Sequence, residues 1–330
     1  MAVNNSTTTL TQEMSIYYDK LFLERLQAET CYDFLTSKRT IPKNSGKVIY
    51  MTRQTAFTPS TASLTEGTTP SAIAFSAATV SATVAGYGDY TTFSDLFSLT
   101  GIDAGLKEKV STFGQYAAEK MDTVRVNVMA AGATIQYAND KYTGQGTPLT
   151  ALLSTDTLDV ADVRKVVLTL KKAKAPKFES PVGSLNKGGA YRAVLSSQGY
   201  FDLLGDSGTG AFTAINIATS DAGRGDVKNQ EIKRIAGVDI MESNLMYTEI
   251  SCGAGTANDI AYSNIFCGKD AFIEVDVAGS GNPRVELATA KQSVADPLAQ
   301  INVLAYTMDS WAVVVGNSSW SVNKKSYGTA

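Results

Sequence analysis

The feature that most restricts how this chain can fold is a long run of apolar residues spaced three or four positions apart. It extends from Ile102 to Ile135 and matches the 3.6-residue period of an α-helix. At 1.5 Å per residue the pattern predicts a helix roughly 50 Å long, which Gly114 and Gly132 are expected to weaken or bend. A one-faced helix of this length supports a packed sheet more often than a ligand site, so we interpret it as a structural spine. The apolar positions are Ile102, Leu106, Val110, Phe113, Ala117, Met121, Val124, Val128, Ala131 and Ile135.

A second unusual segment, residues 55–85, contains Glu66 as its only charged residue. It follows a strand-like alternation over residues 47–54 and turns at residues 64–70, which predicts a long β-hairpin with a register-shifting bulge near residues 77–78. A monomer protects exposed sheet edges with lysine, proline or a covering element. We therefore expect a neighbouring subunit to cover this hairpin, and packing on its own domain is the alternative. Before the bulge the apolar residues Ile73 and Phe75 occupy odd-numbered positions, and after it Val80, Ala82 and Val84 occupy even-numbered ones.

The rest of the chain mixes helical and strand patterns without strict β-α-β repetition, which predicts an α+β arrangement. A polar arm over residues 1–12 precedes an amphipathic stretch over residues 14–36. Asp156 or Thr157 is expected to cap a helix over residues 158–174. Further helices are expected at residues 200–204 and 227–235, strands at 190–196, 238–241, 260–267 and 311–315, and a glycine-rich loop at 206–226.

The composition points to a surface that faces other protein. Charged residues make up 18% of the chain, against about 25% in an average soluble protein. A surface poor in charge suggests association, although a plain surface rich in Ser, Thr and Gly is the alternative. The net charge of −3 argues against a dedicated nucleic-acid binder, and we interpret the basic cluster at residues 164–177 as a solvated helix face.

The chain contains no histidine, which excludes histidine metal ligands, histidine general bases and an imidazole switch near neutral pH. Its three cysteines form no metal-type pair and indicate a reducing compartment. The first residues lack the pattern of a signal peptide, and no apolar run is long enough to span a membrane. We therefore expect synthesis in the cytoplasm and no membrane partner.

Short catalytic patterns occur, but each lacks its supporting residues. Residues 205–208 match the nucleophile loop of serine proteases, yet the chain has no histidine to accept the proton of Ser207. Ser-x-x-Lys patterns occur twice, at residues 184–187 and 321–324, without the third motif that such acyl-enzymes carry. We expect no enzyme activity, cofactor or metal, and a histidine-free serine hydrolase using Ser207 or Ser184 is the alternative.

Three short motifs in a fixed order resemble the coliphage N-four-like major capsid family of tailed bacteriophages. They are Leu64-Thr65-Glu66-Gly67 followed by Pro70, the segment Arg234-Ile235-Ala236-Gly237-Val238-Asp239-Ile240-Met241-Glu242-Ser243, and Asp296-Pro297-Leu298-Ala299-Gln300. After Gln300 the chain departs from the Gly-Trp-Lys-like segment that the family often carries.

The resemblance implies an α+β Hong Kong 97-type fold. Its expected parts are an N-terminal arm at 1–45, an extended β-hairpin loop at 46–100, a spine helix with peripheral strands at 101–155, and an axial α+β domain at 156–330, with part of 270–300 returning to the peripheral region.

The resemblance also implies a function. It predicts self-assembly into pentamers and hexamers that form an icosahedral phage head around double-stranded DNA, with nonspecific DNA contact and scaffold, portal and decoration proteins as further partners. A tail-tube, portal-associated or surface-layer protein is the alternative. By analogy, Leu64, Glu66, Gly67 and Pro70 are expected to lap onto a neighbouring subunit, and Gly208 and Gly210 to lie near a capsomer axis.

Overall fold

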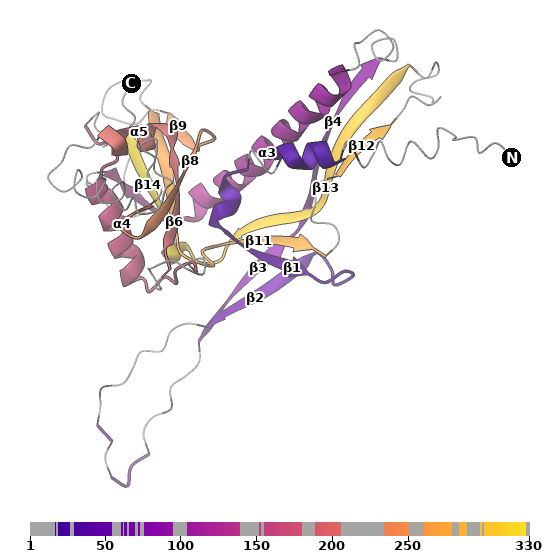
Figure 1. The fold of residues 1–330 in the computed structure, drawn as a ribbon. Coiled ribbons are helices and arrows are strands. Elements are labelled where there is room, and N and C mark those ends of the chain that lie inside the picture. The colour runs from indigo at the N-terminus through magenta and orange to yellow at the C-terminus, as the bar shows by residue number, and fades with distance from the viewer. Residues whose placement is uncertain are drawn as a thin grey trace, which may run out of the picture.

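The chain folds into an elongated part and a compact part, which a long helix connects, and a narrow hairpin projects from the elongated part (Figure 1). We describe this fold from a computed structural model. The described residues are 17, 19–26, 30–54, 61, 63, 64, 66–69, 72, 76–94, 104–138, 152, 155–179, 189–205, 234–250, 260–278, 284–288, 298 and 300–327.

The predicted spine is helix α3 (Ala104–Gly132), whose 29 residues make it about 43 Å long at 1.5 Å per residue. The prediction that it continues to Ile135 is wrong, because Ile135 belongs to strand β5 (Thr134–Tyr137). Gly132 is the last residue of the helix. A Cβ atom there would lie 2.1 Å from the Val315 side chain, so the missing side chain lets β13 pack closely against the end of α3.

The elongated part is built on a five-stranded sheet that α3 covers on one face (Figure 1). Strand β13 pairs antiparallel with β4, β11 and β12, and β1 adds to β11 in parallel. The sheet therefore joins segments from both halves of the sequence. Its strands are β1 (Thr36–Ile41), β4 (Ala85–Ser94), β11 (Phe272–Val277), β12 (Arg284–Ala288) and β13 (Ile301–Val315).

The core of this part lies between α3 and the sheet. Val110, Ala117 and Met121 are buried on one face of α3, as the periodicity predicted. They pack against Trp311 of β13 and against Phe22, which lies in a helical stretch at residues 19–26.

The compact part is a seven-stranded mixed sheet with helices α4 (Val160–Lys172) and α5 (Ser197–Gly205). Leu203 of α5 and Val163 of α4 share one buried cluster with strands of the sheet. Strand β14 lies between β10 and β5, and β5 follows directly on α3, so the sheet is attached to the end of the spine. The remaining strands are β6 (Tyr191–Ser196), β7 (Arg234–Ile235), β8 (Val238–Ser243), β9 (Thr248–Ile250), β10 (Ile260–Cys267) and β14 (Ser321–Tyr327).

Two local predictions in the compact part are wrong. Helix α4 is capped by Asp159, whose Oδ1 accepts a hydrogen bond of 2.6 Å from the Asp162 backbone N–H, and not by Asp156 or Thr157. Residues 234 and 235, expected at the end of a helix, form strand β7, because the turn at Ala236 and Gly237 pairs them with β8. Both errors arise from tertiary pairing that local patterns do not contain.

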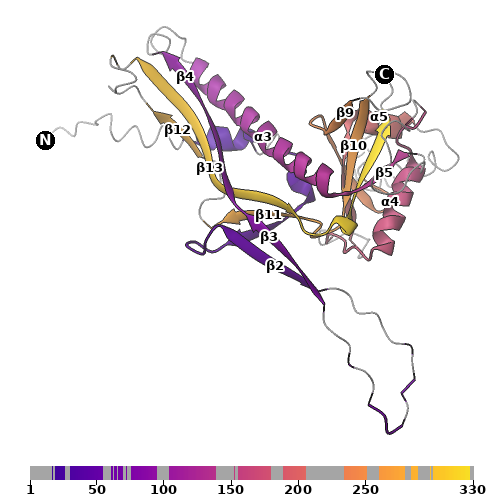
Figure 2. The same cartoon turned by 180° about the vertical axis from the view of Figure 1, so that it is seen from behind.

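The predicted hairpin consists of β2 (Val48–Gln54) and β3 (Ala77–Thr83), which pair antiparallel without interruption. Ala82 and Val84 pack against the sheet, and Val80, two residues before Ala82, lines a groove beside it, which agrees with the predicted alternation of these three residues. The bulge predicted near Ala77 and Ala78 is absent there, because both residues keep the regular pairing with Gln54 and Arg53. Ile73 and Phe75 lie outside the described residues. In both views the hairpin leaves the five-stranded sheet and points away from the two larger parts (Figures 1 and 2).

The described helices do not combine the length and the apolar character that a membrane crossing requires.

Candidate assembly surfaces

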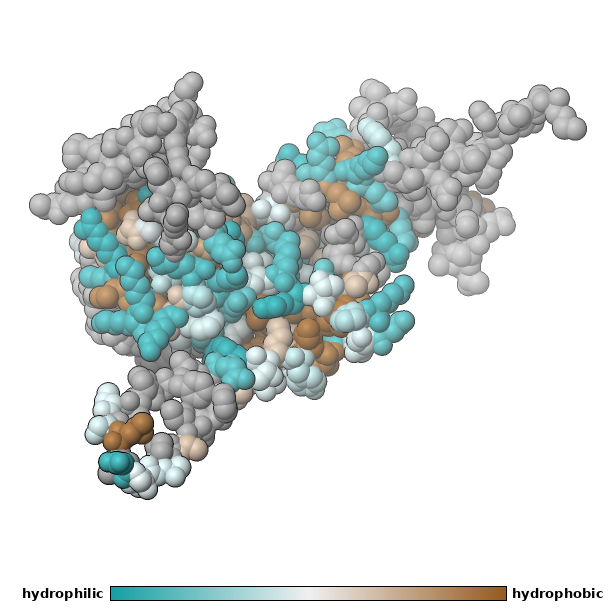
Figure 3. All heavy atoms as spheres, turned by 60° about the horizontal axis from the view of Figure 1, so that its bottom comes forward, coloured by the Kyte–Doolittle hydropathy of each residue, from teal (hydrophilic) through white to brown (hydrophobic). Residues whose placement is uncertain are grey.

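The hairpin tip is the most exposed part of the predicted contact region. Leu64 has 78% of its surface exposed, and Glu66 and Gly67 are also exposed. Gly67 adopts a positive φ of 79°, a turn conformation that favours glycine. Figure 3 shows a hydrophobic patch beside a hydrophilic one at this tip. Pro70, Gly208 and Gly210 lie outside the described residues, and their contacts stay predictions.

The paired strands of the hairpin are held, at the end nearest the loop, by an arginine that sequence patterns did not single out. Arg53 Nη1 donates a hydrogen bond of 3.2 Å to the Gly316 carbonyl oxygen. The same guanidinium lies 5.5 Å from the centre of the Trp320 ring, within the range of a cation–π interaction. These contacts fix the direction in which the hairpin leaves the body.

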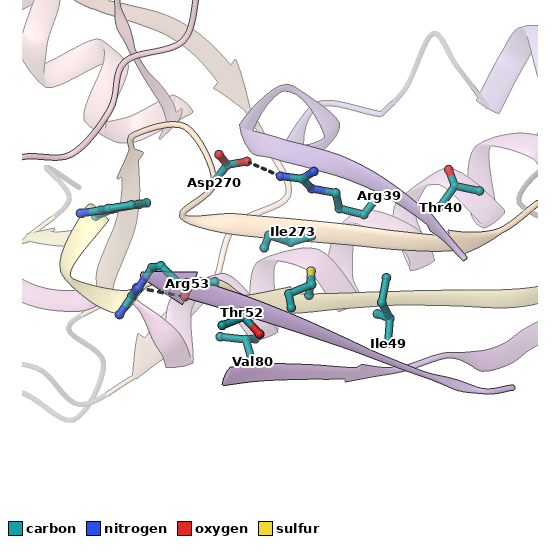
Figure 4. Close-up of a pocket in the computed structure, with 11 residues that line it drawn as sticks. Arg39, Thr40, Ile49, Thr52, Arg53, Val80, Asp270 and Ile273 are labelled. Carbon is teal, nitrogen blue, oxygen red and sulfur yellow. Dashed lines mark hydrogen bonds and ion pairs between the residues drawn. The ribbon is translucent and has the colours of Figure 1, made fainter. Parts of the chain in front are cut away.

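A groove of about 560 Å³ runs between the hairpin and the sheet (Figure 4). Arg39 of β1 lies at its rim and forms an ion pair of 3.7 Å with Asp270. The floor is mainly apolar, so the groove combines hydrophobic contact area with two guanidinium groups. Its lining residues are Arg39, Thr40, Ile49, Met51, Thr52, Arg53, Val80, Asp270, Ile273, Gly316 and Trp320.

A buried ionic cluster fixes α3 to the sheet beneath it. Arg125 of α3 donates to Asp122 Oδ1 at 2.7 Å and to Glu274 Oε1 at 2.9 Å. Glu274 also accepts from Trp311 Nε1 at 2.6 Å and from Thr36 Oγ1 at 3.0 Å. Burial opposes the charged guanidinium, but the carboxylates of Glu274 and Asp122 raise the pKa of Arg125 above its usual value.

The same cluster reaches the N-terminal segment. Asp122 Oδ2 accepts a hydrogen bond of 2.7 Å from the Cys31 backbone N–H, just before β1 begins. One helix residue thus positions both the guanidinium and the chain that enters β1. The cluster therefore connects the helix, the N-terminal segment and strands β11 and β13.

A second polar cluster ties the middle of α3 to β4 and β13. Asp89 of β4 accepts a hydrogen bond from Lys120 of α3. Its Oδ2 also accepts hydrogen bonds from the hydroxyl groups of Tyr116 and Tyr306, each at 3.3 Å. The hydrogen bond from Lys120 is the main cause that lowers the pKa of Asp89 below its ordinary value. This cluster keeps the helix in register along the sheet.

The second Ser-x-x-Lys pattern is part of the core of the compact part. Ser321 and Lys324 are fully buried in β14. Lys324 Nζ lies 3.0 Å from Asp162 Oδ1, and Ser321 Oγ donates to the Ser318 carbonyl oxygen at 3.2 Å. This serine therefore faces the interior, where a substrate has no access. Ser184 and Ser207 lie outside the described residues.

Among the described residues, histidine, cysteine, aspartate and glutamate side chains form no group of three or more suited to a metal ion.

Comparison with solved structures gives matches that span almost the whole chain. The capsid of Ralstonia phage GP4 is 13% identical, with a TM-score of 0.65, and covers 90% of this chain and 88% of its own. The capsid of Helicobacter pylori bacteriophage KHP30 is 12% identical, with a TM-score of 0.66 and 91% of each chain covered. The capsid of cyanophage P-SCSP1u is 16% identical, with a TM-score of 0.59, and covers 89% of this chain and 87% of its own.

No protein-family model and no curated protein sequence matches the chain. The structural matches nevertheless identify the fold, because they cover about nine tenths of this chain and of theirs with TM-scores of 0.59 to 0.66. The chain has the α+β fold of phage capsid proteins, the Hong Kong 97-type fold that the motifs implied. Membership of the N-four-like family within that fold stays a prediction.

Proposed function

We propose that this chain is the major capsid protein of a tailed bacteriophage, which assembles with itself into the shell of the phage head. The observation that carries the proposal is the likeness to phage capsid proteins over about nine tenths of this chain and of theirs.

The exposed hairpin supports self-association. Outward side chains of β2 include Tyr50, which has 72% of its surface exposed, and the tip carries Leu64 in full solvent contact. A large apolar side chain on a two-stranded ribbon gains little stability in water, because such a ribbon is marginal by itself. These side chains are exposed in a single chain because a second copy of the chain covers them in the assembly.

The finer parts of the proposal concern partners and place. The subunits form pentamers and hexamers that close an icosahedral head around double-stranded DNA, after synthesis in the host cytoplasm. DNA contact is nonspecific, because the chain carries a net charge of −3. Scaffold, portal and decoration proteins are further partners, and the chain catalyses no reaction.

The division into parts follows the same proposal. Residues 1–45 form the N-terminal arm, 46–100 the extended loop region, 101–155 the spine and 156–330 the axial domain. Strands β11, β12 and β13 return to the sheet beside the spine, which supports a peripheral segment within the last region.

The test is to express the chain alone, measure its mass distribution by analytical ultracentrifugation and image the heaviest fraction by negative-stain electron microscopy. We expect closed shells or rings with five-fold and six-fold symmetry. Tubes or planar arrays would instead support the tail-tube or surface-layer alternative, because symmetry separates these assemblies. A chain that stays monomeric with and without a co-expressed scaffold would contradict the proposal.

A further inference from the structure

The compact part holds a lysine and an aspartate together in its interior, and the proposed assembly uses neither of them. Lys324 of β14 and Asp162 of α4 are both fully buried, and Lys324 Nζ lies 3.0 Å from Asp162 Oδ1. The two residues come from distant parts of the sequence. They meet because α4 packs on the sheet through an apolar cluster that includes Val163 and Val322. Lysine is among the residues least often fully buried, so this pair calls for a chemical explanation.

The interior around this pair opposes its two charges. Moving an ammonium group and a carboxylate out of water costs free energy that their mutual attraction does not always offset. An amide bond between the two side chains carries no charge, and it keeps one N–H donor and one carbonyl acceptor. The covalent form therefore suits a buried position better than the ion pair does.

The geometry places the two groups close enough to react. An amide forms when the lysine nitrogen attacks the carboxyl carbon, and reacting atoms in productive positions lie roughly 3–3.5 Å apart. Asp162 Oδ1 is bonded to that carbon, so the 3.0 Å between Nζ and Oδ1 brings Nζ to the edge of this range.

Both residues are also held in place through their backbones. The Asp162 N–H donates a hydrogen bond of 2.6 Å to the capping residue Asp159. The Lys324 carbonyl oxygen accepts a hydrogen bond of 3.2 Å from Asn264 Nδ2. Groups fixed in a productive geometry reach effective concentrations on the order of 10⁵ to 10⁸ M. That range exceeds the concentration of liquid water, which favours the amide once its water has left.

Lys165 lies on the solvent side of this pair. Its Nζ is 4.0 Å from the same Asp162 Oδ1, and 42% of its side chain is exposed. An ammonium group at this position stabilises negative charge that develops on the departing oxygen. It also connects the buried carboxylate with the surface, where a released water can leave.

We propose that Lys324 and Asp162 of one chain join in an intramolecular amide bond after the compact part has folded. The ammonium group first passes one proton to the carboxylate, which leaves an amine beside a carboxylic acid. The Nζ–Cγ bond then forms, the nitrogen loses a second proton to the departing hydroxyl group, and the Cγ–O bond breaks to release one water molecule. The ion pair contains every atom of the amide and of the water, so the step needs no oxidant, cofactor or further reactant. It happens once in each chain and is not enzyme turnover.

The bond ties the first turn of α4 to β14, a strand that lies inside the sheet between β10 and β5. It closes a large loop of the chain and therefore restricts the unfolded state, as a disulfide does. The compact part thereby gains a covalent brace between a helix and its sheet. The inference goes beyond the proposed function and does not depend on it, because the bond forms within one chain whether or not chains assemble.

Mass spectrometry of the full chain, purified in the folded state and then denatured, tests the bond directly. We expect a mass that is lower than the mass of the sequence by one water molecule. After proteolysis we expect a branched peptide that joins the segments around residues 162 and 324, which distinguishes this bond from water lost elsewhere. The full sequence mass, or a loss of water without the branched peptide, would overturn the inference and leave the proposed function intact.

Single substitutions identify the nitrogen and the carboxyl group. Lys324→Met keeps a long side chain but removes the nucleophile, so this chain should have its full mass. The matched control is Lys325→Met, since Lys325 is the next residue of β14 and is also buried, with 4% of its surface exposed. It should still lose the water, and an equal loss in the Lys324→Met chain would contradict the inference.

Asp162→Asn adds a second chemical signature. Attack of Lys324 on an asparagine releases ammonia and forms the same amide, so this variant and the unaltered chain should end at the same mass. If a substituted chain fails to fold, the mass and the peptide map of the unaltered chain still decide between an amide and an ion pair.

Discussion

Arg125 of α3 donates a hydrogen bond of 2.9 Å to Glu274 of β11, although the two residues are 149 positions apart in the sequence. Both side chains are buried, with 3% and 9% of their surface exposed. This pair therefore joins the spine helix to a strand that arrives from the second half of the chain. Its loss would affect the stiffness of the whole elongated part.

Glu274→Ala tests the importance of this cluster. The substitution leaves the buried Arg125 guanidinium with Asp122 at 2.7 Å and the more distant Asp33 at 3.8 Å, and it removes the acceptor for Trp311. We expect the free energy of unfolding to fall by about 3 kcal/mol, the lower end of the range for a broken buried ion pair. Urea unfolding of the subunit, followed by tryptophan fluorescence, measures the change.

The control for this substitution is Glu286→Ala on the neighbouring strand β12. Glu286 forms an ion pair of 3.5 Å with Arg284, but 64% of its side chain is exposed. Exposed pairs contribute about 0–1 kcal/mol, so the loss should be at most about 1 kcal/mol. Equal losses for the two variants would contradict a special role for the buried cluster.

Gly132→Ala tests the junction between α3 and β13. The added methyl group would lie 2.1 Å from the Val315 side chain, so one of the two elements has to shift. We expect destabilisation of about 1–3 kcal/mol, as for other overpacked sites. Gly205→Ala, at the end of α5, is the control because its Cβ position is open, and thermal unfolding compares the two. A Gly132→Ala protein as stable as the Gly205→Ala protein would show that the Val315 side chain moves aside without a loss in the free energy of unfolding.

Stability and assembly should respond to acid through carboxylates and not near neutral pH. The chain has no histidine, so we expect no step in assembly between about pH 6 and 7. The pKa of Asp89 lies below its ordinary value of 3.8, mainly because Lys120 donates to it. Its contribution to stability is therefore present above about pH 4 and is lost as the pH falls through its folded-state pKa.

Asp89→Asn is the variant that isolates this effect. It removes the titrating group, so the variant should show a flatter loss of stability with falling pH than the unaltered protein. Unfolding measured at a series of pH values from neutral to strongly acidic gives both curves. A steep transition between pH 6 and 7 would contradict the expectation for the chain as a whole.

Deletion of residues 55–72 separates folding from assembly. The four residues that remain between β2 and β3, positions 73–76, are enough to close the paired strands Gln54 and Ala77. We therefore expect a soluble, folded subunit that cannot close shells, detected by circular dichroism and by sedimentation. Normal particles from the deleted chain would rule out the hairpin tip as an assembly contact.

The spacing of apolar residues predicted those helices and strands that have a regular pattern within their own segment. The three-and-four spacing predicted α3, because Val110, Ala117 and Met121 are buried on one face of its first part. Further along the helix Ala131 is exposed, and the buried apolar residues are Val126, Met129 and Ala130. Alternation predicted β2, the apolar character of residues 260–267 predicted β10 as a buried strand, and the scarcity of charge over residues 55–85 indicated the exposed hairpin. The motifs that resemble a capsid family indicated the fold, and the structural comparisons confirm it at the level of the Hong Kong 97-type fold.

Only the tertiary structure determined which segments that are distant in the sequence lie together. Strand β1 pairs with β11, 236 positions away at Thr36 and Phe272, and neither segment alone specifies its partner. Arg125, Glu274 and Arg53 resemble any other charged residues in the sequence, since burial and ion pairing depend on which surfaces meet. The end of α3 at Gly132 has the same origin: the apolar period continues to Ile135, but Thr134 to Tyr137 pair with β14 as strand β5.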